Sequence, residues 1–149
     1  DSRAVTILIV YSTAGFAGAM IWGRAADRFG ARLSLALDCV MISVGILLIL
    51  LADSSLGLAL LWAVFWGIAM TGQITLQRVI FADYYGRGRL GSIVGFVTVF
   101  QTIAQAVGPL VASGAYDVLG SYTSAFLVFS ASSFVGAGLV ALARPPART

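Results

Sequence analysis

Residues 33–51 read LSLALDCVMISVGILLILL, an apolar run in which Asp38 is the only charged residue. An α-helix of about 20 mostly apolar residues is long enough to cross a hydrocarbon core about 30 Å thick. The run also lacks the alternation of polar and apolar residues that is typical of a strand in a membrane barrel. We therefore predict that these residues form a transmembrane helix.

Four other runs share this character. They span residues 5–22, 56–80, 91–115 and 122–142. The breaks between the five runs are short and contain residues that favour turns, namely Gly30, Asp53, Gly86 and Gly120. We predict an all-α membrane protein with five transmembrane helices.

The composition agrees with a membrane protein. Of the 149 residues, 60% are hydrophobic and only 10% are charged, and the mean hydropathy is +0.99, whereas soluble domains contain about 25% charged residues. The chain has no His, all its basic residues are Arg and all its acidic residues are Asp. It therefore lacks the residue types for a Ser-His-Asp triad or a His-containing zinc site. We expect no enzymatic activity, no metal and no cofactor.

The arginines indicate how the chain is oriented. They cluster after the first, third and fifth spans, at positions 24, 28 and 32, at 87 and 89, and at 144 and 148. The breaks after the second and fourth spans contain Asp53 and Asp117 but no Arg. Because short cytoplasmic loops retain Arg, we expect a multi-pass protein of the cell (inner) membrane with a cytoplasmic C-terminus. This distribution explains the net charge of +3 without nucleic-acid binding.

The connection after the first span contains a recognisable motif. Residues 23–32 read GRAADRFGAR and resemble the signature loop of the major facilitator superfamily, Gly-x-x-x-Asp-Arg-x-Gly-Arg-Arg, with Ala31 in place of the first of the paired basic residues. In that family the loop joins spans 2 and 3 and recurs between spans 8 and 9. The resemblance implies a conformational latch on the cytoplasmic side, with Asp83 as the acidic partner of Arg28 or Arg32. The latch residues are Gly23, Asp27, Arg28, Gly30, Arg32 and Asp83.

Two later segments resemble the second half of such a transporter. Residues 81–93, FADYYGRGRLGSI, are similar to the passage between spans 10 and 11 in family members of the organic-anion type. Residues 116–126, YDVLGSYTSAF, are similar to the end of span 11 and the entry to span 12. The resemblance implies that residues 1–149 form the C-terminal transmembrane half-domain, spans 8 to 12, truncated at the N-terminus. Its partners are then membrane lipid, a small-molecule substrate and the missing N-terminal half.

The family resemblance implies a secondary active transporter of a small organic solute that works by alternating access. The nearest likeness is to monocarboxylate and oxalate/formate carriers, which place a basic residue in span 8 or 11 to hold the anion. Those spans carry Tyr11, Gln101 and Gln105 here, so the basic residue would have to come from the missing half. Two alternatives remain open: a drug or metabolite exporter of the same superfamily, and a non-transporting membrane sensor or assembly module.

Polar residues inside the spans are candidates for substrate contact, because the hydrocarbon core offers them no water. Gln101 and Gln105 lie four residues apart near the middle of their span and therefore share one helix face. Gln73 and Gln77 repeat this spacing, and Tyr11 lies near mid-depth. Since the family resemblance makes spans 8, 10 and 11 line the cavity, we predict that Tyr11, Gln73, Gln101 and Gln105 bind substrate. Hydrogen bonds between helices are the alternative for each of them.

Two charged residues also lie within spans. Arg78 has a stem long enough to place its guanidinium among the lipid headgroups, and this is the interpretation we favour. Asp38 is a candidate for carrying a coupling proton, since it is the only acid well inside a span. The alternative, favoured because span 9 is peripheral in the resembled fold, is a structural bond from Asp38 to a cytoplasmic arginine such as Arg32.

Overall fold

The computed structural model describes residues 2–52 and 55–143. This part of the chain forms five α-helices and one 3₁₀ turn, which are α1 (Ser2–Phe29), α2 (Ala31–Ala52), α3 (Leu56–Tyr85), η1 (Arg87–Arg89), α4 (Leu90–Leu119) and α5 (Thr123–Leu142). All five α-helices are long and apolar enough to cross a membrane. The prediction of an all-α membrane fold with five spans is therefore confirmed. Asp53 and the tail from residue 144 lie outside the described residues.

Three glycines end helices where the sequence predicts turns. Gly30, Gly86 and Gly120 follow α1, α3 and α4 and have φ angles of 86°, 77° and 66°. This region of backbone space is favourable for glycine, which has no Cβ. The Gly120 N–H donates to the Tyr116 carbonyl at 2.7 Å and so satisfies one of the last carbonyls of α4.

The motif region differs from the prediction. We expected the first span to end near residue 22 and residues 23–32 to form a loop, but α1 continues to Phe29 and the turn is reduced to Gly30. The reason is local, since the Ala and Arg residues between Gly23 and Phe29 favour a helix. α3 and α4 likewise extend beyond their predicted ends, to Tyr85 and Leu119.

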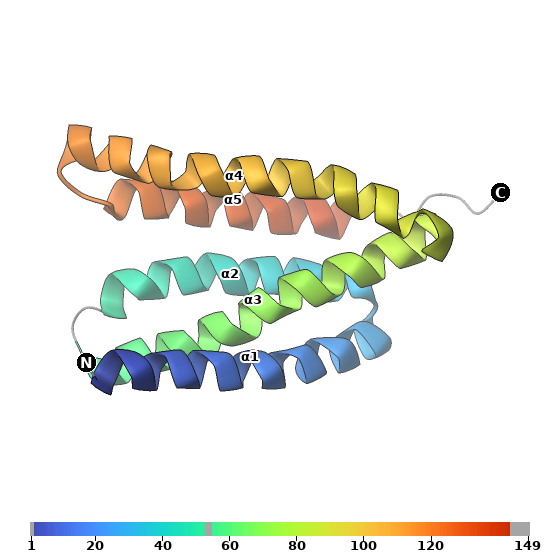
Figure 1. Cartoon of the computed structure of the whole chain (residues 1–149), viewed down its shortest axis with the longest axis horizontal. Coiled ribbons are helices and arrows are strands. Elements are labelled where there is room, and N and C mark those ends of the chain that lie inside the picture. The colour runs from blue at the N-terminus through green and yellow to red at the C-terminus, as the bar shows by residue number, and fades with distance from the viewer. Residues whose placement is uncertain (1, 53–54, 144–149) are drawn as a thin grey trace.

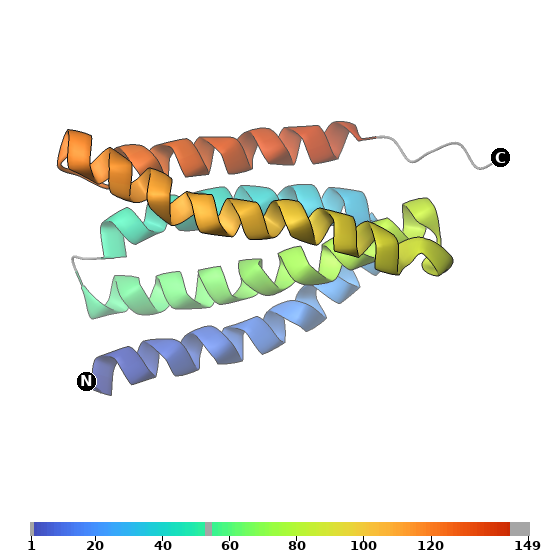
Figure 2. The same cartoon turned by 45° about the horizontal axis from the view of Figure 1, so that its top comes forward.

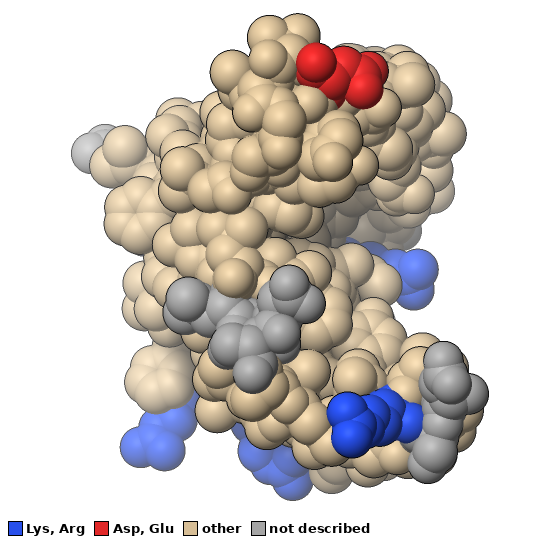
Figure 3. Space-filling view, turned by 90° about the vertical axis from the view of Figure 1, so that its left-hand side faces the viewer, with Lys and Arg blue, Asp and Glu red and all other residues tan. Residues whose placement is uncertain are grey.

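The helices run up and down in an elongated bundle (Figures 1 and 2). One end of the bundle carries the α1–α2 turn, the η1 connection and the end of α5, and the other carries the start of α1 and the α4–α5 turn. The arginine-rich connections therefore share one end, as the alternation of charge predicts. Seen from the opposite end, most of the surface is uncharged, with acidic atoms at the top of the view and arginine atoms along its lower part and right side (Figure 3).

Packing within the bundle is uneven. α1 packs mainly on α3, and α2 packs on both α3 and α5. Within the described part, α4 contacts only α3, α5 and η1, and it contains no buried residue. The described part of the chain therefore covers α4 only in part.

Glycines bring α1 and α3 into backbone contact. A Cβ added at Gly18 would lie 2.8 Å from the Ile68 Cα, and one added at Gly67 would collide with the Tyr11 carbonyl oxygen. Small residues of this kind allow transmembrane helices to approach closely, and packing then stabilises the pair. The same close approach does not occur at Gly23, where an added Cβ would meet nothing within 4 Å.

Two serines join α2 to α5. The hydroxyl oxygens of Ser43 and Ser130 lie 2.8 Å apart, and each hydroxyl also approaches the other residue's carbonyl, at 2.8 and 3.0 Å. Both side chains are buried. Polar groups in a membrane need such partners, so this exchange of hydrogen bonds is a structural contact of the last helix.

Candidate functional site

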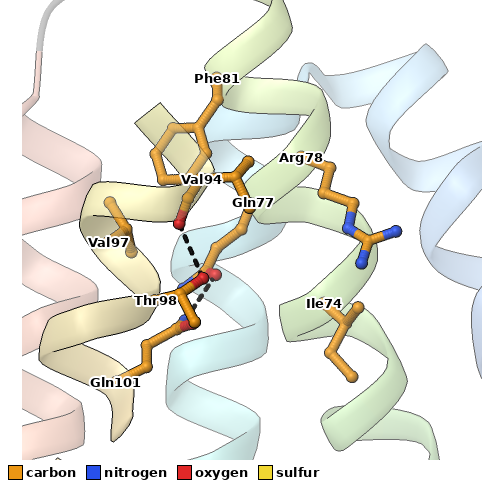
Figure 4. Close-up of a pocket in the computed structure, with 8 residues that line it drawn as sticks. All are labelled: Ile74, Gln77, Arg78, Phe81, Val94, Val97, Thr98 and Gln101. Carbon is orange, nitrogen blue, oxygen red and sulfur yellow. Dashed lines mark hydrogen bonds between the residues drawn. The ribbon is translucent and has the colours of Figure 1, made fainter. Parts of the chain in front are cut away.

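A cavity of about 240 Å³ lies between α3 and α4, in the half of each helix nearer to η1 (Figure 4). α3 contributes Ile74, Gln77, Arg78 and Phe81, and α4 contributes Val94, Val97, Thr98 and Gln101. On both helices these positions follow the spacing i, i+3, i+4 and i+7, which marks one face of a helix. The cavity is therefore formed by two facing stripes of side chains.

Two amides lie at the centre of this cavity. The Gln101 Nε2 atom donates to the Gln77 Oε1 atom at 2.9 Å, and both side chains are half-buried (Figure 4). Thr98 is turned to its own helix, because its hydroxyl donates to the Val94 carbonyl at 2.7 Å. Gln101 thus makes the hydrogen bond to a neighbouring helix that the sequence left open as the alternative. It also lines the cavity, and its contact with substrate stays a prediction.

Arg78 lines the same cavity but extends away from the two amides (Figure 4). Its side chain is exposed, and in the described part of the chain it has neither a hydrogen bond nor an ion pair. The cavity contains no acidic side chain. It is therefore a cationic, donor-rich site in which Gln77 and Arg78 occupy positions that the sequence analysis did not assign to substrate.

The other predicted substrate residues on α3 and α4 lie outside this cavity. Gln105 is exposed on α4, one helical turn beyond Gln101, and Gln73 is half-buried on α3, one turn before Gln77. Neither amide has a hydrogen bond in the described structure. Their contact with substrate stays a prediction.

Tyr11 lies in a separate cavity of about 380 Å³ between α1 and the first half of α3. Trp62 and Trp66 form part of the wall and stack with ring centroids 5.8 Å apart. The Trp62 indole N–H donates to the Gly45 carbonyl at 3.1 Å, which fixes one of the two rings. The structure therefore does not bring Tyr11 and Gln101 into one site, because they line separate cavities and α1 does not contact α4 among the described residues.

A third, open cavity of about 540 Å³ lies at the arginine-rich end, where the latch residues Gly30, Arg32 and Asp83 form part of the wall. No ion pair joins Asp83 to Arg28 or Arg32 among the described residues. Instead the Arg32 guanidinium donates to the Ala143 carbonyl at 3.0 Å, and the Tyr84 hydroxyl donates to the same oxygen at 3.3 Å. The free carbonyls at the end of α5 attract a cation, so Arg32 is held by α5 in this structure.

Asp27 and Arg28 lie in the last turn of α1 and are exposed. Neither forms an ion pair in the described part of the chain. Both side chains are therefore accessible to a helix outside the described part of the chain. The latch pairing with Asp83 therefore stays a prediction for another conformational state.

Asp38 is completely buried where α1, α2 and α3 meet. Neither of its carboxyl oxygens, nor the buried hydroxyl of Ser34 one turn earlier, has a hydrogen-bond partner among the described residues. A Cβ added at Gly72 would collide with both the Asp38 carboxyl and the Trp22 indole, which shows how closely the three helices meet. The favoured bond from Asp38 to Arg32 is wrong for this structure, because Arg32 reaches the end of α5. A role of Asp38 in proton coupling stays a prediction.

The family follows from the sequence of the whole chain. The model of the Major Facilitator Superfamily matches residues 3–149. The chain belongs to the Major Facilitator Superfamily. Its five membrane-length helices make it a multi-pass membrane protein of that superfamily, which agrees with the resemblance found in the motif at residues 23–32.

Three relatives of known sequence have names that describe transport. The uncharacterized MFS-type transporter YwfA of Bacillus subtilis is 27% identical over 136 residues, which cover 91% of this chain and 32% of the relative. A triacylglyceride transporter of Mycobacteroides abscessus is 26% identical over 85% of this chain and 24% of the relative. The efflux pump dotC of Dothistroma septosporum is 31% identical over 68% of this chain and 17% of the relative. The chain thus spans about a third or less of each of these major facilitator relatives. No solved structure matches it.

Membership of the superfamily supports a transporter and gives no ground for an enzyme. It does not identify the substrate. Gln77 and Arg78 were not assigned to substrate, because Gln77 was considered only as the partner of Gln73 in the repeated spacing and Arg78 was expected to reach the headgroups. The repeated i, i+3, i+4, i+7 spacing on residues 74–81 and 94–101 was the available signal.

Proposed function

We propose that this chain is the C-terminal half-domain, spans 8 to 12, of a secondary active transporter that moves a small organic solute by alternating access. The observation that carries the proposal is the α3–α4 cavity with its paired amides. At a rise of 1.5 Å per residue, Gln101 lies roughly 5 Å from the centre of α4, and transporters of this type bind substrate near the membrane midplane. The N-terminal half is the proposed partner, in an inner membrane with the C-terminus in the cytoplasm.

A monocarboxylate-like solute is the substrate class that we favour. A drug or metabolite exporter is the second candidate, supported by the names of two relatives, an efflux pump and a triacylglyceride transporter. The Tyr11 cavity favours this candidate in one respect, because its other lining residues are apolar or aromatic and suit a hydrophobic substrate. They are Ala4, Ile7, Leu8, Trp62 and Trp66.

The substitution Gln101→Ala is expected to weaken substrate binding. It removes a donor and an acceptor from the cavity and also the bond to Gln77, and the loss of one neutral hydrogen bond corresponds to an increase of about 3- to 10-fold in apparent KM. The measurement is initial uptake by the transporter containing this chain, over a range of solute concentrations. We expect Gln105→Ala to have a smaller effect in the same direction, since Gln105 lies outside the cavity.

The matched control for this series is Ser132→Ala. The Ser132 hydroxyl donates only to carbonyls of its own helix α5, at 2.5 and 3.2 Å, and the residue is exposed and does not line the cavity. We expect its KM to be that of the wild type. Equal increases in all three variants would mean that the assay reports general packing and that the cavity does not bind substrate.

The substitution Asp27→Asn is expected to slow transport more than it lowers expression or substrate binding. A charge-assisted contact of Asp27 with the other half would contribute about 1.5–3 kcal/mol to one conformational state, and its loss changes a two-state population ratio by about tenfold or more. Turnover per molecule is measured at matched protein levels, with Asp117→Asn at the opposite end of the bundle as control. Normal turnover in the Asp27 variant would leave the motif as a topology signal alone.

A further inference from the structure

We propose that the α3–α4 cavity recognises the oxyanion of its solute, a carboxylate, and that Arg78 supplies the positive charge. This inference rests on the proposed function and assigns the residue of the same site that binds the carboxylate. It departs from the sequence interpretation, in which Arg78 reaches the headgroups and the charge comes from another part of the transporter.

Hydrogen-bonding capacity is the first argument. Gln101 uses one N–H and Gln77 uses its carbonyl oxygen in their mutual bond. Both N–H groups of Gln77, one N–H of Gln101 and the five N–H groups of Arg78 are then free of partners in the described structure. Donors therefore outnumber acceptors at this site, and a ligand rich in acceptors fits it best.

Charge is the second argument. The Arg78 Cα lies about 10 Å before the end of α3 at 1.5 Å per residue, at a depth where a charged group needs a partner or water. No acid lines the cavity. Of the nearest candidates, Asp83 lies on the separate cavity at the latch motif and Asp38 is buried in the α1–α2–α3 junction. The described residues thus leave the charge of Arg78 unbalanced, and an anionic solute balances it.

Geometry is the third argument. The two amides form a fixed group across the helix pair, whereas the Arg78 side chain extends to the rim (Figure 4). Rotation of its flexible stem moves the guanidinium towards a ligand that lies against the amides. A guanidinium binds a carboxylate through two parallel N–H···O bonds, and the free N–H groups of Gln77 and Gln101 would reach the remaining oxygen lone pairs. A volume of about 240 Å³ suits a solute of a few heavy atoms.

Both walls of the cavity belong to this chain, so binding is tested without transport. The probes are pyruvate and formate, with pyruvamide as the neutral analogue, added to the purified chain in an uncharged detergent. Binding is measured by titration calorimetry. We expect the two carboxylates to bind and pyruvamide to bind at least tenfold more weakly, because the loss of a bond to a charged group costs that much in affinity.

Three variants identify the residue responsible. Arg78→Gln is expected to raise the dissociation constant for pyruvate about tenfold or more, and Arg78→Lys to raise it less, because the charge remains but the two-pronged geometry is lost. Arg89→Gln, an exposed arginine of η1 outside the cavity, serves as the matched control and should bind as the wild type does. Equal pyruvate affinity in wild type and Arg78→Gln, or no binding of either carboxylate by the wild type, would overturn the proposal.

A final arm separates a solute from a lipid headgroup. If Arg78 instead binds the phosphate of a lipid, dispersed phosphatidylglycerol will bind in an Arg78-dependent way and pyruvate will not. Failure of the carboxylate-binding test is distinguishable from failure of the proposed function, because the proposed function is tested by measuring solute flux. In the transporter that contains this chain, carboxylate binding without any solute flux would support the anion site and refute the proposed transport. Flux of neutral solutes alone would support transport and overturn the anion site.

Discussion

Liposomes that contain this chain and no other protein are expected to show no saturable solute uptake. Transport requires that the polar groups of the site are enclosed by protein. In this chain α4 has no buried residue, Gln105 is exposed and Arg78 lies at the open rim of its cavity. Exposed polar groups in hydrocarbon are unfavourable, and a cavity that the proposed N-terminal half does not enclose cannot open alternately to the two sides of a membrane. Uptake should return when the proposed N-terminal spans are co-expressed with the chain.

The measurement is uptake of radiolabelled solute against its concentration. The comparison requires that the chain alone is inserted and helical, which protease protection and circular dichroism of the same liposomes establish. As a control, the proposed N-terminal spans are co-expressed with the Asp27→Asn variant of this chain. We expect this variant to assemble with them but to transport solute more slowly than the wild-type chain. Saturable uptake from the chain alone would refute the half-transporter proposal and indicate that several copies of the chain assemble into a complete carrier.

The substitution Gly67→Ala is expected to destabilise the α1–α3 pair strongly. Its Cβ would collide with the Tyr11 carbonyl oxygen and lie 3.3 Å from the Ala14 Cβ, so that one helix must move away from the other. Overpacking of this kind costs about 1–3 kcal/mol. We expect a lower midpoint of thermal unfolding in detergent, and Gly18→Ala should act in the same way because its Cβ meets the Ile68 backbone.

Gly95→Ala is the matched control. It makes the same chemical change on a transmembrane helix, but an added Cβ at Gly95 meets nothing within 4 Å. Alanine favours a helix over glycine by about 1 kcal/mol, so this variant should unfold at the same temperature as the wild type or slightly higher. Equal destabilisation by Gly67→Ala and Gly95→Ala would show that helix propensity, and not the close approach of α1 to α3, is being measured.

Local features of the sequence determined the helices and their ends. The run at residues 33–51 became α2, Ala31–Ala52, because its apolar length exceeds what a hydrocarbon core requires. Gly30, Gly86 and Gly120 ended helices as expected, since their conformation depends on the absence of a Cβ at one position. The motif at residues 23–32 likewise pointed to the superfamily without any knowledge of packing. Local reasoning was wrong for the loop expected at residues 23–32, where α1 continues to Phe29. The helix propensity of the residues after Gly23 had been underestimated.

The contacts between helices were decided by the tertiary structure alone. The sequence placed Gln101 and Gln105 on one face, but it did not show that Gln101 meets Gln77, or that Arg78 shares their cavity. It also suggested Arg32 as a partner for Asp38, whereas Arg32 bonds a carbonyl that lies 111 residues away.

The physical reason is that helical periodicity identifies residues that share a face but not the neighbour that this face meets. In a soluble protein the apolar face marks the buried side. In a membrane, lipid is as apolar as the protein interior, so hydrophobicity does not distinguish the two sides of a helix. The choice of neighbour and the relative height of two helices then depend on the close approach of small residues such as Gly18 and Gly67. That fit is a property of two surfaces together, and it is visible only when the folded chain places them side by side.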